Sequence, residues 1–202
     1  NSLESISLLK QKLQAKKTDF LTDTVFVGIA NDELCLFQKG TSLQLMKYRP
    51  FLFDFLYYSF LESFGIYENF YEIQTTISME IGDSDDDRTI QEMLQEYFGI
   101  EWSQGHLKIP NIFAHTTLSI PDDFKWSELL DSVIYAIDWE DEEKSLNQII
   151  ICLSKFYSKF INFSSNLFDS IKRRCYSKEL VKSENIVLLT DLPDLYRVFE
   201  RC

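Results

Sequence analysis

The spacing of apolar and polar positions divides this chain into segments of two kinds. Near its start, three short runs of β-branched, aliphatic and aromatic residues are separated by Asn, Asp and Gly. Such runs, bounded by residues that favour turns, predict β-strands. We expect strands at Val25–Ala30, Glu33–Phe37 and Leu43–Tyr48, with turns at Asn31-Asp32 and Lys39-Gly40.

The next segment, Phe51–Phe64, is apolar on nearly every side. Pro50 precedes it, where a first helical residue needs no N–H donor, and Gly65 follows it, where a positive φ ends a helix. The pattern predicts a helix buried on most of its surface. Although very apolar, the run contains Asp54 and Glu62 and is too short to cross a bilayer.

Helical spacing occurs in five further segments, and four short runs outside them predict more strands. Helices and strands occur in blocks, which predicts an α/β chain of the α+β kind. The predicted helices contain Leu3 to Leu13, Ile90 to Phe98, Trp126 to Ile137, Leu146 to Phe160 and Ser165 to Arg174, and the strands Glu72–Ile77, Ile100–Ser103 with His106–Ile109, and Ile186–Leu189.

Composition narrows the functional classes. The chain has 202 residues, of which 45% are hydrophobic and 15% aromatic, enough for a core and for aromatic anchors at an interface. Its net charge of −12 argues against autonomous binding to nucleic acid, which needs cationic surface against the phosphates. The cysteines at 35, 152, 175 and 202 are widely spaced and form no compact framework, which favours reduced thiols inside the cell.

Catalytic and metal motifs are scarce. The sequence has no GxxxxGK[ST], GxGxxG or GxSxG motif, and neither His106 nor His115 has a metal-ligating partner at helical spacing. An EF-hand loop starting at Asp83 would need Gly and Glu where Arg88 and Leu94 stand, so the acidic run there is read as a solvated loop before a helix.

A second acidic run, Asp138-Trp139-Glu140-Asp141-Glu142-Glu143, precedes a predicted helix. Acids at a helix start are stabilised by the helix dipole, which explains the run adequately. It could also hold a cation, supply an acid/base pair, or dock a basic peptide. The residues alone leave these alternatives open.

The last eleven residues, Leu192-Pro193-Asp194-Leu195-Tyr196-Arg197-Val198-Phe199-Glu200-Arg201-Cys202, resemble the extreme C-terminus of the MutL homologue one family. That family is the shared subunit of eukaryotic MutL mismatch-repair heterodimers. Weaker similarities follow in the same order: Phe26-Val27-Gly28, the helix ending in Phe64-Gly65, and Asp138 to Glu142 leading to Phe156-Tyr157-Ser158.

The resemblance implies a two-lobed MutL C-terminal-type domain, with a dimerisation lobe at about 1–50 and 143–202 and a spine helix and outer lobe at 51–142. It implies a nuclear DNA mismatch-repair subunit that pairs with a PMS-type MutL subunit. The partner would carry the metal-dependent endonuclease, whose Asp-Gln-His-Ala motif is absent here. This domain would therefore be non-catalytic and bind no cofactor by itself, and the ATPase domain would lie upstream.

The resemblance also assigns roles to residues near the C-terminus. Cys202 would reach the partner's metal site, which would hold zinc or manganese, because zinc accepts both a thiolate and a carboxylate. Leu195, Val198 and Phe199 fall at i, i+3 and i+4 and would anchor the tail on the partner together with Cys202. The strands between Val25 and Tyr48 would complete the interface.

Glu142, with Asp141 and Glu143 as neighbours, would dock basic-aromatic peptides of the repair exonuclease and other repair proteins. The alternative for these acids is that they only stabilise the helix start. Two alternatives for the whole chain are a free-standing metal-dependent hydrolase built on its acidic residues and a homodimeric scaffold.

Overall fold

The computed structural model describes residues 2–12, 17–75, 85–103, 105–113, 116–182 and 184–199. The chain divides into two compact units, and each is built from two stretches of sequence. Unit 1 comprises Asn1–Gln11 with Leu56–Ile161, and unit 2 comprises Lys12–Phe55 with Asn162–Cys202. The helix α2 (Tyr48–Glu62) contributes its first half to unit 2 and its second half to unit 1.

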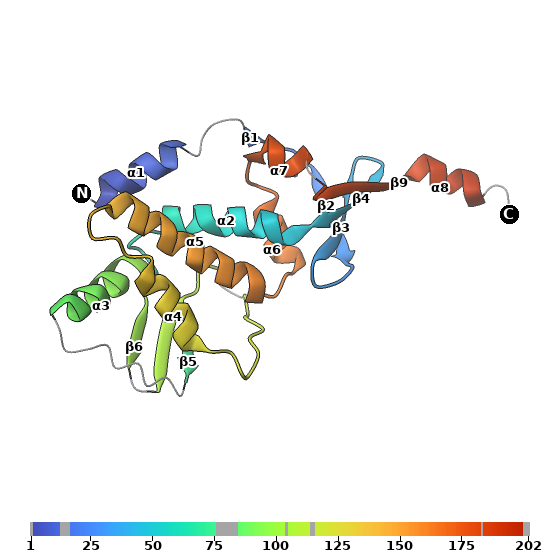
Figure 1. The fold of residues 1–202 in the computed structure, drawn as a ribbon. Coiled ribbons are helices and arrows are strands. Elements are labelled where there is room, and N and C mark those ends of the chain that lie inside the picture. Colours follow the sequence, from blue (N-terminus) through green and yellow to red (C-terminus); the bar gives the residue numbers. More distant parts are fainter. Residues whose placement is uncertain are drawn as a thin grey trace. The chain divides into compact units, whose positions relative to one another are not determined.

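Unit 2 is organised around a four-stranded antiparallel sheet of order β2-β3-β4-β9 (Figure 1). The three N-terminal strands confirm the sequence prediction to within two residues. Asn31 shapes the first turn, because its Oδ1 accepts hydrogen bonds from the backbone N–H groups of Glu33 and Leu34, each at 2.9 Å. The strands are β2 (Thr24–Ile29), β3 (Leu34–Lys39), β4 (Ser42–Lys47) and β9 (Ile186–Asp191).

One face of this sheet forms the core of unit 2. Cys35 pairs with Met46 across β3 and β4, and both side chains are fully buried. The helix α6 (Ser165–Ile171) covers this face, with the Phe168 ring 5.3 Å from that of Phe26. Ser164 caps α6 by accepting a hydrogen bond from the Leu167 N–H.

Shorter elements complete unit 2. A two-residue strand β1 (Lys17–Thr18) pairs with β8 (Tyr176–Ser177), which is followed by α7 (Lys178–Lys182). The last helix, α8 (Leu192–Phe199), directly follows β9 in Figure 1, and its first N–H donates to the Thr41 carbonyl at 2.9 Å.

Unit 1 combines a three-stranded antiparallel sheet of order β5-β7-β6 with helices α1, α3, α4 and α5. Gly105, at φ 77, lies in the turn between β6 and β7. The elements are α1 (Ser2–Lys12), β5 (Phe70–Gln74), α3 (Asp85–Phe98), β6 (Glu101–Ser103), β7 (His106–Pro110), α4 (Trp126–Tyr135) and α5 (Glu142–Phe160).

The core of unit 1 is centred on α5 and the second half of α2. The rings of Phe60 and Tyr157 lie 5.5 Å apart, and the Tyr57 hydroxyl donates to Asn147 Oδ1 at 2.6 Å. Tyr157 is almost completely buried, and its hydroxyl donates to the Pro110 carbonyl, so its polar atom has a partner inside the core. Burial raises the pKa of Tyr157 well above its ordinary value.

The apolar helix α2 starts three residues earlier than predicted, at Tyr48, and ends at Glu62. Pro50 is thus its third residue, still within the first turn, where an N–H has no partner inside the helix. Gly65 has a φ of 72, as its predicted place after the helix requires. The predicted helix 165–174 ends at Ile171, and the two-residue strands and α7 were not predicted.

α5 packs on the second half of α2, and both belong to unit 1. The expected lobes, 1–50 with 143–202 and 51–142, differ from the two units, because residues 1–11 and α5 fall in unit 1 and residues 51–55 in unit 2. Which unit dimerises stays a prediction. Of the predicted strand 72–77, the last two positions lie outside the described residues. Among the residues described, no helix is both long and apolar enough to span a membrane.

Charge is unevenly divided between the units. Unit 1 has 7 Lys and Arg against 21 Asp and Glu, a net charge of −14, whereas unit 2 has 13 against 11, a net charge of +2. Together they give the −12 of the whole chain. Attraction for basic partners is therefore a property of unit 1.

Candidate functional site

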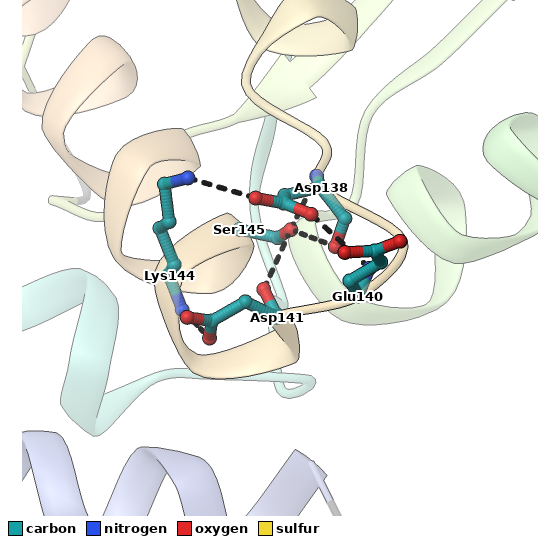
Figure 2. Close-up of polar contacts among 5 residues, drawn as sticks. All are labelled: Asp138, Glu140, Asp141, Lys144 and Ser145. Atoms are coloured by element: carbon teal, nitrogen blue, oxygen red, sulfur yellow. Dashed lines mark hydrogen bonds and ion pairs between the residues drawn. The ribbon is translucent and has the colours of Figure 1, made fainter.

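The acidic run predicted from the sequence forms the connection between α4 and α5 in unit 1. Asp141 is the residue preceding α5, with φ −136 and ψ 90, and its side chain accepts a hydrogen bond from the Lys144 N–H at 2.9 Å. Asp138 accepts from the Glu140 N–H at 3.1 Å and forms an ion pair of 2.8 Å with the Lys144 ammonium group (Figure 2). Local hydrogen bonds thus account for two of the acids.

Ser145, in the first turns of α5, holds this connection in place. Its hydroxyl accepts a hydrogen bond from the Asp138 N–H at 2.6 Å and lies 2.9 and 3.0 Å from the carbonyl oxygens of Asp138 and Asp141 (Figure 2). The side chain is buried. A buried hydroxyl with both donor and acceptor roles satisfied fixes the geometry of the loop.

The Asp138–Lys144 pair also affects ionisation. The hydrogen bond from Lys144 is the main cause that lowers the pKa of Asp138 below its usual value, and the backbone N–H of Glu140 adds to it. The same pair raises the pKa of Lys144. Both groups are exposed to solvent, so the pair is charged at neutral pH and is screened by salt.

The three acids predicted to dock peptides have different environments. Asp141 caps α5 and is therefore used locally. Glu142 is exposed and accepts a hydrogen bond of 3.3 Å from the Ser5 hydroxyl of α1. Glu143 is half-buried. Glu142 is thus exposed and does not cap the helix, and peptide docking there stays a prediction.

A hollow of about 650 Å³ lies beside the same connection, on the other side of α5 from Glu142. Two aromatic side chains at its edge are strongly exposed: Tyr135 to 93% and Trp139 to 64%. A second hollow, of about 510 Å³, shares Ser132 and Tyr135 with the first. The first is lined by Ser132, Tyr135, Ala136, Ile137, Asp138, Trp139, Glu140, Lys144, Gln148 and Cys152.

Sequence reasoning missed this hollow. Tyr135 lies outside the apolar face of α4 that buries Leu129, Leu130 and Val133, and that departure from the helical spacing was the available signal. Trp139 was noted only as part of the acidic run. None of Asp141, Glu142 and Glu143 lines the hollow.

The second candidate surface is the face of the unit 2 sheet opposite its core. Val25 is 63% exposed and Val27 52%, and both lie on β2 at the edge of the sheet. Leu45 pairs with Leu36 on one side and with Val187 on the other, so aliphatic side chains continue across three strands. Val187 of β9, on the same face as Leu45, is also about half exposed.

The predicted C-terminal anchor is only partly described. Val198 lies on α8 and is 61% exposed, next to the equally exposed Tyr196. The side chains of Leu195 and Phe199 lie outside the described residues, although both positions belong to α8. Cys202 lies outside the described residues too. The helical spacing proposed for the tail is thus confirmed, whereas the interface role stays a prediction.

No group of three or more His, Cys, Asp or Glu side chains that could hold a metal ion occurs within the described part of the chain. His106 lies on β7, in register with Gln74 and Ser103, and His115 lies outside the described residues. The run 83–87 considered for calcium is only described from Asp85, as the first turn of α3.

A comparison with protein families identifies the family of this chain. Residues 2–82, 88–166 and 161–202 match the family described as DNA mismatch repair protein Mlh1 C-terminus. The chain belongs to this family. The match spans both units, so it covers the acidic connection and α8 alike.

Two curated relatives are similar over the whole chain. Putative MutL protein homolog 1 of Schizosaccharomyces pombe is 28% identical over 240 aligned residues, covering 99% of this chain. DNA mismatch repair protein MLH1 of Saccharomyces cerevisiae is 24% identical over 261 aligned residues, covering 100%. The chain spans about a third of the length of these relatives, at 35% and 34%.

Proposed function

We propose that this chain is the C-terminal heterodimerisation domain of a nuclear DNA mismatch-repair MutL subunit and that it pairs with a PMS-type subunit. The observation that supports this most is the exposed aliphatic face of the unit 2 sheet, together with family membership. Exposed apolar side chains that continue across neighbouring strands are typical of a protein interface, so this face favours one.

The composition of this face suits a stable protein–protein contact. Its exposed residues include Val25 and Val27 on β2 and Val187 on β9, and none of these three carries a charge. Depletion of charge and enrichment of apolar side chains characterise the centre of interfaces. Unit 2 has a net charge of only +2, so it would not repel an acidic partner. Unit 1, with a net charge of −14, would do so.

The C-terminus would complete the metal-dependent endonuclease site of the partner, and the chain itself would be non-catalytic. Cys202 lies three residues beyond α8, so it can reach at most about 11 Å from Phe199. Its thiolate and α-carboxylate are ligand types that zinc accepts, whereas manganese would use the carboxylate alone. The remaining ligands would come from the partner.

Glu142 would dock basic-aromatic peptides of the repair exonuclease and other repair proteins. Its carboxylate is exposed at the start of α5, and the contact recorded for it within the described residues is a weak 3.3 Å hydrogen bond from Ser5, which a basic side chain can replace. Asp141 is less suited because it caps the helix. The net charge of unit 1 adds a general attraction for cationic peptides.

A homodimeric scaffold is the second candidate, because the same aliphatic face could pair with a second copy of itself. Sedimentation velocity separates the two. We expect the chain to form a complex with a PMS-type C-terminal domain that outcompetes any self-association. A chain that remains a homodimer in the presence of that domain would refute heterodimerisation.

A pair of variants tests the location of the interface. Val27→Asp places a charge on the exposed sheet face, whereas Ile66→Asp places one on an exposed apolar residue of unit 1. We expect Val27→Asp to weaken the heterodimer at least 30-fold and Ile66→Asp to leave it unchanged, since a buried unpaired charge costs several kcal/mol. Equal affinities would place the interface elsewhere.

A further inference from the structure

The last helix, α8, exposes every one of its described side chains, which are those at positions 192–194 and 196–198. The helix extends away from the unit 2 sheet in Figure 1. Its ion pair between Arg197 and Asp194, 3.9 Å long, joins two residues of the helix itself and attaches it to nothing else. The direction of α8 therefore depends on how its first residues are held.

Two hydrogen bonds join the start of α8 to the tip of the β3–β4 hairpin. The Leu192 N–H donates to the Thr41 carbonyl at 2.9 Å, and the Ser42 hydroxyl donates to a carboxylate oxygen of Asp191. Ser42 and Asp191 also stand opposite each other in the register of β4 and β9, and both side chains are half-buried. We call these four residues the hairpin clasp. All four belong to unit 2.

The tip of this hairpin is a firm support. Lys39 pairs with Ser42, so the loop between β3 and β4 has only two residues, and Gly40 takes the positive φ of 58 that such a short loop needs. The side-chain amide of Gln38 donates to the Gly40 carbonyl at 2.7 Å and braces the turn. A group attached to this tip is thus attached to the sheet itself.

A bulge in β9 brings the carboxylate to the hydroxyl. In the pairing of β4 with β9, Leu189 is an extra residue without an opposite number. A bulge bends its strand and shifts every following residue by one position. Without it, Thr190 would stand opposite Ser42, and Asp191 would lie opposite the loop residue Thr41. The bulge therefore aligns the one pair of side chains that ties the start of α8 to the hairpin.

We propose that Ser42 is a positioning residue, whose hydrogen bond to Asp191 fixes the direction in which α8 leaves the sheet and thereby places the C-terminal residues against the partner. Asp191 directly precedes α8, where an acid can also cap the helix. Ser42 belongs to another strand, so its bond adds nothing to a cap and joins the helix to the sheet. Only the placement against the partner rests on the proposed function.

The length of α8 makes its direction matter. A helix of 8 residues is about 12 Å long, so a tilt of about 10° at its start moves its far end by about 2 Å. A displacement of about 1 Å at reacting groups can cost about a hundred-fold in rate. Because the hydrogen bond from Ser42 ends on a charged carboxylate, it is of the stronger kind and suits this task.

Distance measurements on the whole chain test the clasp. Nitroxide labels are attached to p-acetylphenylalanine at positions 47 and 198, which are exposed on β4 and α8, so the native cysteines stay unlabelled. Double electron–electron resonance then gives the distribution of the distance between the labels. We expect Ser42→Ala to widen this distribution at least two-fold, because the helix loses its tie to the hairpin.

Three variants control this measurement. Ser42→Thr keeps the hydroxyl and Asp191→Asn keeps an acceptor oxygen, so both should give the wild-type width. Ser170→Ala removes a hydroxyl of the same unit that donates within α6, to the Asn166 carbonyl at 3.2 Å, and should also give the wild-type width. A wild-type width in Ser42→Ala, or an equal widening in Ser170→Ala, overturns the clasp.

The heterodimer with a PMS-type subunit tests the positioning role. We expect Ser42→Ala to lower DNA nicking at least five-fold with the Kd of the heterodimer unchanged, and Ser42→Thr to restore nicking. Wild-type nicking in Ser42→Ala, where Cys202→Ser does lower it, overturns positioning, and so does a loss of nicking that only parallels a loss of affinity. If the wild-type chain does not pair with a PMS-type subunit, the proposed function fails, and the distance widths alone decide whether Ser42 directs α8.

Discussion

The hydroxyl of Ser145 accepts a hydrogen bond from the backbone N–H of Asp138 at 2.6 Å, which ties the end of the α4–α5 connection to the second turn of α5. The hydroxyl is buried, so no solvent replaces it when it is removed. One side chain therefore holds the loop that carries Trp139 and the acidic residues around it.

Ser145→Ala is expected to destabilise the chain by about 1–3 kcal/mol, because the Asp138 N–H loses its partner in a buried position. Urea unfolding measures the change. Ser132→Ala is the matched control, since the Ser132 hydroxyl donates only to the Glu128 carbonyl on the exposed side of α4, and we expect a change below about 0.5 kcal/mol. Equal effects would mean that Ser145 does not hold the loop.

The pair between Asp138 and Lys144 predicts a pH dependence of stability. The pKa of Asp138 is lowered from 3.8 in the folded chain, so its contribution is fully present above that value and is lost as the pH falls through the lower folded pKa. The pKa of Lys144 is raised from 10.5, so its contribution is present below that value and is lost as the pH rises through the higher folded pKa.

The Tm difference between the wild type and Lys144→Met should therefore be largest near neutral pH and shrink below about pH 3.8. It should also shrink in 1 M salt, because the pair is exposed. Lys155→Met provides the control, since Lys155 lies on the same helix and forms no ion pair with the described residues. A difference that is constant from pH 3 to 7 would contradict the coupling.

Gly99 and Gly65 differ in their surroundings although both have positive φ, 62 and 72. A Cβ on Gly99 would stand 2.9 Å from Phe70 Cε1 and 3.1 Å from Tyr67 Cδ2, whereas nothing lies within 4 Å of one on Gly65. Gly65→Ala should cost about 1–2 kcal/mol from backbone strain alone, and Gly99→Ala about 1–3 kcal/mol more from overpacking. Chemical denaturation of the two variants measures the difference, and equal losses would exclude the clash.

Cys202→Ser is expected to lower DNA nicking by the heterodimer at least ten-fold while assembly survives, if the thiol ligates the partner's metal. The variant with a Ser-Gly-Ser extension after Cys202 should show the same loss, because the α-carboxylate is displaced from the end. Nicking and metal content at wild-type levels in Cys202→Ser would remove the thiol from the site. Failure to assemble would instead assign the tail a packing role.

Glu142→Ala should weaken binding of a basic-aromatic peptide from the repair exonuclease at least five-fold and leave the heterodimer intact. Asp141→Ala serves as the contrast, because it removes the cap of α5 and should cost stability, by about 1 kcal/mol, rather than peptide affinity. Isothermal titration calorimetry measures the first effect. Unchanged peptide affinity in Glu142→Ala would leave this acid a helix-start residue only.

The sequence predicted those features that short-range chemistry determines. Turn residues and β-branched runs located β2, β3 and β4, and Pro50 with Gly65 bracketed most of α2, because each signal acts within a few residues. The pairing of Lys17 with Ser177 has no such signal. It depends on two distant segments meeting in the folded chain, and two residues carry too little pattern to predict a strand.

The candidate sites also differ in how far the sequence predicts them. The acidic run was correctly placed at a helix start, since the cap and the dipole act locally. The hollow beside α4 and α5 was not predicted, because a hollow is produced by the packing of two helices. The sequence shows only that Tyr135 and Trp139 are aromatic. Aromatic residues are usually buried, so their exposure had to be seen in the fold.

The strand β2 is the edge of its sheet and exposes Val25, Val27 and Ile29 beside an unpaired row of backbone groups. An uncovered apolar edge of this kind is a template for indiscriminate strand addition between copies. Copies of the chain made in excess of the partner that covers this edge would be lost by aggregation or proteolysis. The soluble amount of the chain in the cell would then follow the amount of that partner. The valines that would favour a stable assembly would thereby also tie the soluble amount of the chain to that of its partner.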